Sequence, residues 1–386
     1  MKILHTSDWH LGHSLVGYDR TEEQQKMLDQ MVAIVRKHRP DIFLLAGDVY
    51  HTSQPATAVQ RMFNQTMVRL HDAHPGMTVI VTAGNHDSGS RHEIFRTPWE
   101  YLNVRMVGTF DRNNPERHII EIAGIGYVIA VPYTNERYLQ EGLLQHLIDK
   151  AGEMNTDNLP VVLTAHTSVS GADFTGHENA TEKTIGGIDA VDIKEIGTGY
   201  DYLALGHIHR PQFVHTGRHN ARYSGSPLPV SFDECYGHTV SLVEIDRHGG
   251  TPAVETIAID NPRPMTTLPL EGVASWEEAK KMLMDFPDDL PDYIRLNIDG
   301  EGVIPVQAKQ EAMQITQNKQ CRFCLLNVVK RKTERNTARQ VTIQEFRQMD
   351  PIEVAEMFAK DTDEAFDGQM REMMKEVIKS LDESEL

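Results

Sequence analysis

The chain has 386 residues and a formal net charge of −18, and it contains three cysteines. This length exceeds the usual size of one hydrophobic core, so we expect two or three domains, and three cysteines exclude a disulfide framework. The negative charge argues against a protein that coats nucleic acid through its overall charge, because nonspecific affinity comes mostly from lysine and arginine.

The chain begins with a short predicted strand at 2–5, and polar residues follow it too soon for a signal peptide. No stretch holds the roughly 18 uncharged apolar residues of a membrane span, so we expect a cytoplasmic protein with no membrane segment. Helical patterns at 22–38 and 56–74 alternate with further apolar runs that predict strands at 41–46, 77–82 and 160–165. This order predicts an α/β fold whose ligands bind beyond the carboxyl ends of the strands.

The second half of the chain carries more predicted strands, at 202–205, 239–245 and 253–259. Pro262-Arg-Pro264 breaks this pattern, so we expect a first domain over 1–260. A second, small α/β domain is predicted over 265–332, from a helix, strand, helix, strand order at 275–286, 293–298, 306–316 and 321–329. Cys321 and Cys324 lie in its last strand without neighbouring histidines, so we expect buried thiols there rather than a zinc or redox site.

Residues 333–386 are predicted to form a basic linker and two C-terminal helices, at 351–360 and 364–381. These helices contain several methionines, which suits either an adaptable docking surface or packing against the second domain. Lys319 to Arg339 holds seven basic residues and one acidic residue, Glu334. We expect Lys330, Arg331 and Lys332 to contact DNA phosphate or an acidic partner; the alternative is a solvated linker.

Five short polar clusters each follow a predicted strand. They are Ser7-Asp-Trp-His10, Ala46-Gly-Asp-Val-Tyr-His51, Ala83-Gly-Asn-His-Asp87, Thr164-Ala-His166 and Leu205-Gly-His-Ile-His209. Together they supply Asp8, His10, Asp48, Asn85, His86, His166, His207 and His209. Such a set is costly to bury unless cations compensate it. Hard oxygen donors with imidazoles and no thiolate predict two octahedral ions, Mn²⁺ or a similar ion such as Mg²⁺, in the paired arrangement that hydrolyses phosphoesters.

The order and spacing of these clusters resemble the calcineurin-like metallophosphoesterase superfamily, whose motifs run Asp-x-His, Gly-Asp, Gly-Asn-His-Asp or -Glu, His, and Gly-His-x-His. The resemblance covers residues 1 to about 240 and implies a β-sandwich flanked by helices. It implies that Asp8, His10, Asp48 and His209 hold one metal ion and that Asp48, Asn85, His166 and His207 hold the other. Asp48 would then bridge the two ions. His86 would be free of metal, placed to protonate the leaving oxygen or to stabilise the transition state.

Three further stretches resemble the SbcD family of bacterial nuclease subunits: residues 1–12, MKILHTSDWHLG; residues 204–209, ALGHIH; and residues 223–234, YSGSPLPVSFDE. The resemblance implies a Mn²⁺-dependent double-strand 3′–5′ exonuclease and single-strand or hairpin endonuclease in DNA repair and recombination. It also implies a homodimer within a heterotetramer, a cap domain that positions DNA, and C-terminal helices that dock on an SbcC-type ABC ATPase. No G-x-x-x-x-G-K-[ST] motif occurs here, so we expect nucleotide to bind at that partner and not at this chain.

His51 stands where many phosphatases of the superfamily carry a second aspartate, which argues against a protein serine/threonine phosphatase. Related archaeal and eukaryotic nucleases resemble this chain at that position, which implies that His51 holds the DNA phosphate; the alternative is a structural partner of His86. Two other functions are weighed against the nuclease. A phosphodiesterase acting on small nucleotides would use the same metal ions, whereas a noncatalytic scaffold is disfavoured because no ligand residue is missing.

Overall fold

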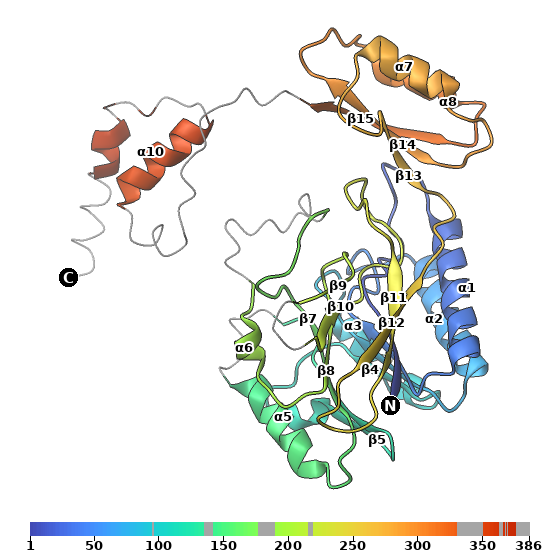
Figure 1. Ribbon diagram of the computed structural model, residues 1–386, viewed down its shortest axis with the longest axis vertical. Coiled ribbons are helices and arrows are strands. Elements are labelled where there is room, and N and C mark those ends of the chain that lie inside the picture. The colour runs from blue at the N-terminus through green and yellow to red at the C-terminus, as the bar shows by residue number, and fades with distance from the viewer. Residues whose placement is uncertain are drawn as a thin grey trace. The chain divides into compact units, whose positions relative to one another are not determined.

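The computed structural model describes residues 1–94, 96–134, 142–176, 190–214, 219–329, 350–362, 366, 368 and 370–375. Residues 1–329 form one compact unit, and residues 330–386 form a second. The first unit contains three sheets (Figure 1), of which two have six strands and the third has three.

The two larger sheets form a β-sandwich. The first has the order β12-β11-β1-β2-β3-β4, with β1 (Lys2–Thr6), β2 (Ile42–Ala46), β3 (Thr78–Thr82), β4 (Val104–Val107), β11 (Thr239–Glu244) and β12 (Ala253–Ala258). The second has the order β5-β6-β7-β8-β10-β9, with β5 (Ile119–Ile122), β6 (Gly126–Ala130), β7 (Val161–His166), β8 (Tyr202–Gly206), β9 (Gln212–Phe213) and β10 (Ala221–Tyr223). Their facing side chains share one buried core, which includes Ile3 and Leu44 from one sheet and Val162 and Tyr202 from the other.

Strand direction brings the functional loops together. β1, β2, β3 and β4 are parallel, and so are β6, β7, β8 and β10. The central strands β2, β3, β7 and β8 are short and fully buried, as expected for parallel strands covered on both faces. In each sheet, therefore, the carboxyl ends of the parallel strands meet at one edge.

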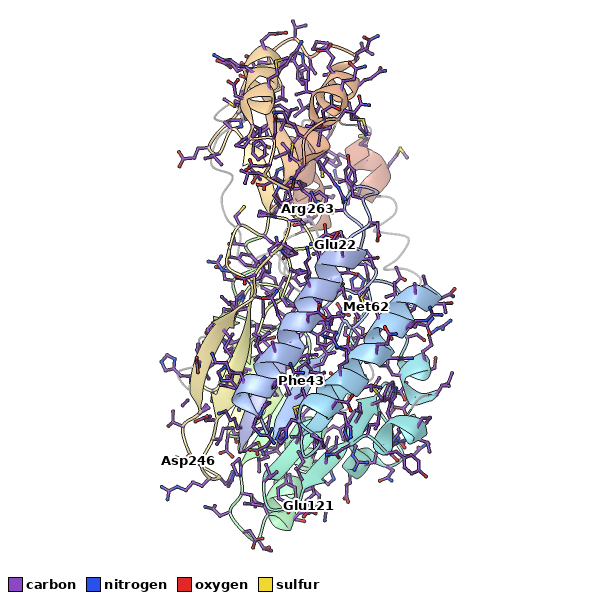
Figure 2. The ribbon with its side chains drawn as sticks, turned by 90° about the vertical axis from the view of Figure 1, so that its right-hand side faces the viewer. Glu22, Phe43, Met62, Glu121, Asp246 and Arg263 are labelled. Atoms are coloured by element: carbon purple, nitrogen blue, oxygen red, sulfur yellow. The ribbon has the colours of Figure 1, made fainter. Side chains whose placement is uncertain are left out.

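Helices cover both outer faces of the sandwich. On the first sheet, α1 (Thr21–His38) and α2 (Thr57–Ala73) lie side by side (Figure 2). Their apolar faces pack against this sheet in one core, which includes Phe43 of β2 and Met62 of α2. In α1 the buried residues Met27, Met31 and Val35 recur at the helical period. α5 (Leu143–Met154) and α6 (Ile193–Ile196) cover the second sheet. The shorter α3 (Gly89–Ile94), α4 (Arg96–Glu100) and η1 (Pro115–His118) flank β4 and β6.

The third sheet belongs to a cap with its own hydrophobic core. Its parallel strands are β13 (Met265–Leu268), β14 (Tyr293–Asp299) and β15 (Arg322–Val329), and its crossover helices are α7 (Trp276–Asp285) and α8 (Ala308–Thr316). The side chain of Ser275 caps α7 through a capping box with Glu278. Cys321 and Cys324 are free, buried thiols of this region, as expected.

The cap is joined to the sandwich by polar and apolar contacts. Arg263 Nε donates to Glu23 Oε1 of α1 at 3.0 Å, and Tyr293 Oη donates to the same oxygen at 2.9 Å. Figure 2 places Arg263 near Glu22, at the end of α1 where the cap begins. Tyr293 and Cys324 also pack against Leu15 and Phe232, which lie in loops of the sandwich.

In the second unit the described residues include one long helix, α10 (Pro351–Thr362), and residues 370–375 are also helical. The predicted helix at 351–360 is therefore confirmed. Within the helix predicted at 364–381, residues 368 and 370–375 are helical and residue 366 is not. Met370 and Met373 are exposed. The basic segment with Lys330, Arg331 and Lys332 lies outside the described residues.

Candidate metal centre

Every predicted ligand lies in a loop or at a strand end on one edge of the sandwich. Asp8 and His10 follow β1, Asp48 follows β2, and Asn85 and His86 follow β3. In the second sheet His166 ends β7, and His207 and His209 follow β8. The two sheets meet here directly, because His166 Nδ1 donates to the carbonyl oxygen of Ala46 in β2 at 2.8 Å.

Donor atoms converge in two overlapping groups. In the first group, Asp8, His10 and His209 present atoms that all lie within 4.8 Å of one another. His10 Nε2 lies 3.1 Å from His209 Nε2 and 3.6 Å from Asp48 Oδ2. The structure thus brings together the four side chains expected to share one ion.

The second group lies on the other side of Asp48. His166 Nε2 is 3.4 Å from Asp48 Oδ2 and 2.9 Å from Asn85 Oδ1. Asn85 Oδ1 is also 3.2 Å from His207 Nδ1. Since a single oxygen of Asp48 faces both His10 and His166, its carboxylate lies between the two groups.

The backbone at this edge is strained. Asp8, His10, Asp48 and His207 all have positive φ, at 54°, 43°, 49° and 97°. Such conformations cost a residue with a side chain about 1–3 kcal/mol and cluster at functional sites. Close packing adds a further constraint, because a Cβ atom on Gly84 would collide with the carboxylate of Asp48. The fold thus holds these side chains in one fixed arrangement at the expense of stability.

Electrostatics show that the pocket needs positive charge. Burial raises the pKa of Asp8, and the neighbouring Asp48 carboxylate adds to this effect. Burial alone would lower the pKa of His166, but the Asp48 carboxylate outweighs it and raises that pKa to about 9. The pKa of Asp48 is lowered in turn, because the positive charge of His166 overcomes the effect of burial. In the metal-free protein, therefore, positively charged histidine balances the buried carboxylates, and divalent ions can take over this role.

The donor set fits divalent metal ions. Asp8 and Asp48 are 1% and 2% exposed, and they lie among oxygen and imidazole donors with no thiolate nearby in the described part of the chain. Hard oxygens mixed with imidazoles suit octahedral divalent ions. The converging side chains include both sets that the family resemblance implies, Asp8, His10, Asp48 and His209 for one ion and Asp48, Asn85, His166 and His207 for the other.

Two acidic residues outside the ligand set fix its geometry, and the sequence motifs had given them no role. Glu234 Oε1 accepts a hydrogen bond from His209 Nδ1 at 3.1 Å and so orients that imidazole. Asp87 Oδ2 accepts from the backbone N–H of Val49 and of Gly84, at 3.0 and 2.9 Å, which ties the loop after β2 to the loop after β3. Both residues belong to stretches that carry the family resemblance.

His86 is held beside the ligands by two hydrogen bonds. Its backbone N–H donates to Asp48 Oδ1 at 2.9 Å. Its Nδ1 lies 3.0 Å from the carbonyl oxygen of His51, and because a carbonyl only accepts, Nδ1 carries the hydrogen. This bond leaves Nε2 as the ring nitrogen available for chemistry.

The side chain of His51 lies parallel to that of His86. The two ring centroids are 5.6 Å apart with an interplanar angle of 18°, and the ring of His13 meets the other side of His51 edge-on at 4.7 Å. The backbone of His51 therefore orients His86, while its imidazole is a separate, partly exposed group of the same pocket.

No helix among the described residues is both long enough and apolar enough to cross a membrane. The family model for calcineurin-like phosphoesterases matches residues 1–211. This match and the convergent donor set define the class: a metal-dependent phosphoester hydrolase.

The SbcD subunit of the SbcCD nuclease of Rhodobacter capsulatus is 32% identical over 307 residues, which are 72% of this chain and 74% of that protein. The same subunit of Escherichia coli K12 is 29% identical over 339 residues, covering 81% and 82% of the two chains. That of Bacillus subtilis is 30% identical over 286 residues, covering 69% and 71%. The chain therefore belongs to the SbcD family within the calcineurin-like phosphoesterases.

Proposed function

We propose that this protein is the DNA-cleaving subunit of an SbcCD-type nuclease. One observation carries the proposal: seven ligand-type side chains converge at the edge of the sandwich, in a chain whose similarity to an SbcD nuclease subunit extends over 339 residues. The phosphoesterase model accounts for residues 1–211 only. The longer match thus includes sequence outside the hydrolase domain, which supports a nuclease subunit over a generic phosphodiesterase.

In this proposal Asp8, His10, Asp48 and His209 hold one Mn²⁺ ion, and Asp48, Asn85, His166 and His207 hold the other. When bound, such ions polarise the scissile phosphate and make water a stronger nucleophile at neutral pH. The chain's own contribution is preorganisation: strained loops and buried hydrogen bonds keep the donor atoms in place before substrate arrives.

His86 is the proposed general acid. Because Nδ1 is engaged by the carbonyl oxygen of His51, a proton can be delivered only from Nε2, to the oxygen that leaves phosphorus. His86 lies close to the ligands, with its ring centroid 4.9 Å from that of His10. It can therefore assist the leaving group without binding metal itself.

His51 is proposed to hold the phosphate of duplex DNA. Its imidazole lies parallel to that of His86 in the same pocket. It can therefore donate a hydrogen bond to a phosphate oxygen of the bound DNA. The backbone carbonyl of His51 accepts the hydrogen bond from His86 Nδ1. In this proposal the imidazole of His51 holds the phosphate, and its backbone carbonyl is the structural partner of His86.

The complete assembly is proposed to contain an SbcC-type ATPase and a dimer of this chain. In it the chain would act as a 3′–5′ exonuclease on duplex ends and as an endonuclease on single strands and hairpins, in DNA repair and recombination. The similarity to SbcD proteins, which are subunits of the SbcCD nuclease, supports this. The exposed Met370 and Met373 of the C-terminal unit suit the adaptable surface that docking on the ATPase requires.

The test is reconstitution. The chain is copurified with the product of an adjacent large ATPase gene and incubated with Mn²⁺, ATP and a long duplex, a hairpin or a cyclic nucleotide. We expect both DNA substrates to be cut, faster with ATP. The same complex with Asp48→Asn controls for contaminating nucleases. If DNA stays intact while the cyclic nucleotide is hydrolysed, the protein is a small-nucleotide phosphodiesterase and not a nuclease.

A further inference from the structure

The loop that supports His209 also touches the cap. In this loop, residues 226–238, Glu234 is buried, and its side chain is 1% exposed. Besides the bond from His209 Nδ1, Glu234 accepts from the backbone N–H of Val230 at 3.2 Å and from Ser226 Oγ at 3.3 Å. Its carboxylate has little freedom of its own, so its position follows that of the loop.

The cap contacts Asp233, the residue immediately before Glu234. Arg295 Nη1 donates to Asp233 Oδ1 at 2.6 Å, and Arg295 Nη2 donates to the carbonyl oxygen of Phe232 at 3.3 Å. The guanidinium also lies over the ring of Phe232, with Cζ 5.3 Å from its centroid. Three contacts from one guanidinium therefore fix two consecutive residues of the loop.

Arg295 is itself held rigidly. It lies in β14, the central strand of the cap sheet, and its Nε donates to Thr267 Oγ1 of β13 at 3.0 Å. The side chain of Arg295 is 14% exposed and that of Asp233 is 31% exposed, so the ion pair is partly shielded from the solvent screening that weakens surface pairs. A cap strand thus acts as a fixed anchor for the loop.

We propose that Arg295 is a positioning residue of the metal centre. It acts through Asp233 on the backbone of Glu234, and through Glu234 on the imidazole of His209. The position of the cap therefore determines the orientation of the imidazole of His209. This inference rests on the proposed role of His209 as a ligand.

The experiment measures Mn²⁺ affinity by calorimetry and hydrolysis of bis-p-nitrophenyl phosphate, a substrate too small to need the cap for binding. Outer partners of ligating histidines contribute about 10- to 100-fold to metal affinity. We therefore expect Glu234→Gln to weaken Mn²⁺ binding by about that factor, and Arg295→Ala, one step further out, by about 3- to 10-fold. The kcat on the small substrate falls with it, while KM for that substrate changes little.

Arg322→Ala is the matched control. It removes the same side chain from the neighbouring strand β15, where the guanidinium lies over the rings of Tyr18 and Tyr293 and not over the loop 226–238. It leaves the contacts of Arg295 with Phe232 and Asp233 in place, so Mn²⁺ affinity should stay close to the wild-type value. Equal Mn²⁺ affinities for Arg295→Ala and Arg322→Ala would overturn the proposal.

Two more variants separate positioning from loss of folding. Arg295→Lys keeps the charge opposite Asp233 and should recover part of the lost affinity. The double variant Arg295→Ala/Glu234→Gln should bind Mn²⁺ no more weakly than Glu234→Gln alone, because the effect of Arg295 passes through Glu234. Additive losses would contradict the relay. If Arg295→Ala does not fold, Arg295→Lys and Asp233→Asn carry the test through the same comparison.

These measurements use no DNA. A complex that leaves DNA intact would contradict the nuclease function but not the effect of Arg295 on His209. Unchanged Mn²⁺ affinity in the Arg295 variants would contradict that effect but not the nuclease function.

Discussion

At the scale of single residues, the proposed function separates groups that hold metal ions from groups that act on substrate. Asp48 faces both His10 and His166, whereas His86 contacts Asp48 through its backbone N–H. Substitutions in the pocket should therefore fall into two classes. Some remove the metal ions, and others leave the ions bound but abolish cleavage.

Asp48→Asn belongs to the first class. It removes the negative charge that both groups of donors share, and we expect purified protein to lose Mn²⁺ from both sites. Metal content by mass spectrometry checks this. Asp8→Asn, which changes a carboxylate proposed to hold only one of the two ions, should lose about half as much. Retention of both ions in Asp48→Asn would exclude a bridging role.

His86→Ala belongs to the second class. General acids contribute roughly 10²- to 10⁴-fold to rate, so we expect a loss of cleavage of that order while metal content stays close to wild type. Single-turnover cleavage and metal analysis on the same preparation measure both. A large loss of Mn²⁺ in this variant would make His86 a ligand.

His51→Ala tests the side chain alone. The substitution keeps the backbone carbonyl that accepts from His86 Nδ1, so the orientation of His86 is preserved. We expect degradation of duplex ends to fall more than cleavage of single strands, because only the phosphate contact is lost. The assay compares both substrates in parallel, and an equal loss on both would reduce His51 to a structural partner of its neighbour.

The ligand residues could be predicted from the sequence because each lies in a short motif that directly follows an apolar strand. Glu234 and Arg295 could not be recognised in this way. Their roles depend on contacts between segments far apart in the chain, namely Glu234 with His209 and Arg295 with Asp233. A charged residue in a loop or strand carries no mark of such a partner in its own sequence.

At the scale of elements, α1, α2 and the strands β1, β2, β3, β7 and β8 were predicted to within two residues, because their apolar patterns are strong. The β5–β6 hairpin, β4 and α5 were not predicted. β4 and β5 have four residues each, and strand preference in so short a segment depends on packing against neighbours rather than on local sequence.

Packing between the two sheets buries an ionisable group with a consequence for stability. His5 of β1 is fully buried, and its Nδ1 lies 2.9 Å from Tyr202 Oη of β8. Burial and the nearby positive charge of Arg222 lower the pKa of His5 from 6.5 to about 3. The unfolded chain therefore binds the proton more readily than the folded protein, so the stabilisation is present above about pH 6.5 and is lost as pH falls from 6.5 toward 3.

His5→Gln should remove this pH dependence and keep a hydrogen-bonding group next to Tyr202. At pH 5 the buried neutral histidine costs about 2 kcal/mol relative to neutral pH, from 1.36 kcal/mol per pKa unit. Urea unfolding of metal-free protein at pH 7 and pH 5 measures the change. Wild type should lose about 2 kcal/mol more than the variant. An identical loss in both would mean that His5 is not responsible.

At the scale of the whole molecule, the chain forms two compact units, and the proposed function assigns hydrolysis to the first and attachment to a partner to the second. The metal centre and the cap that supports it both lie within residues 1–329, and the C-terminal unit begins at Lys330. The hydrophobic cores of the sandwich and the cap draw only on residues of the first unit, as far as the structure describes the chain. Hydrolysis and attachment to a partner should therefore be separable by deletion.

A chain ending at Val329 tests this separation. We expect it to fold, to bind Mn²⁺ and to hydrolyse bis-p-nitrophenyl phosphate at close to the full-length kcat, because every ligand and the Arg295 contact remain. It should no longer copurify with the ATPase, and cleavage of duplex DNA should lose its response to ATP. A shortened chain that still copurifies and still responds to ATP would place the docking surface on the first unit. The C-terminal helices would then need another role.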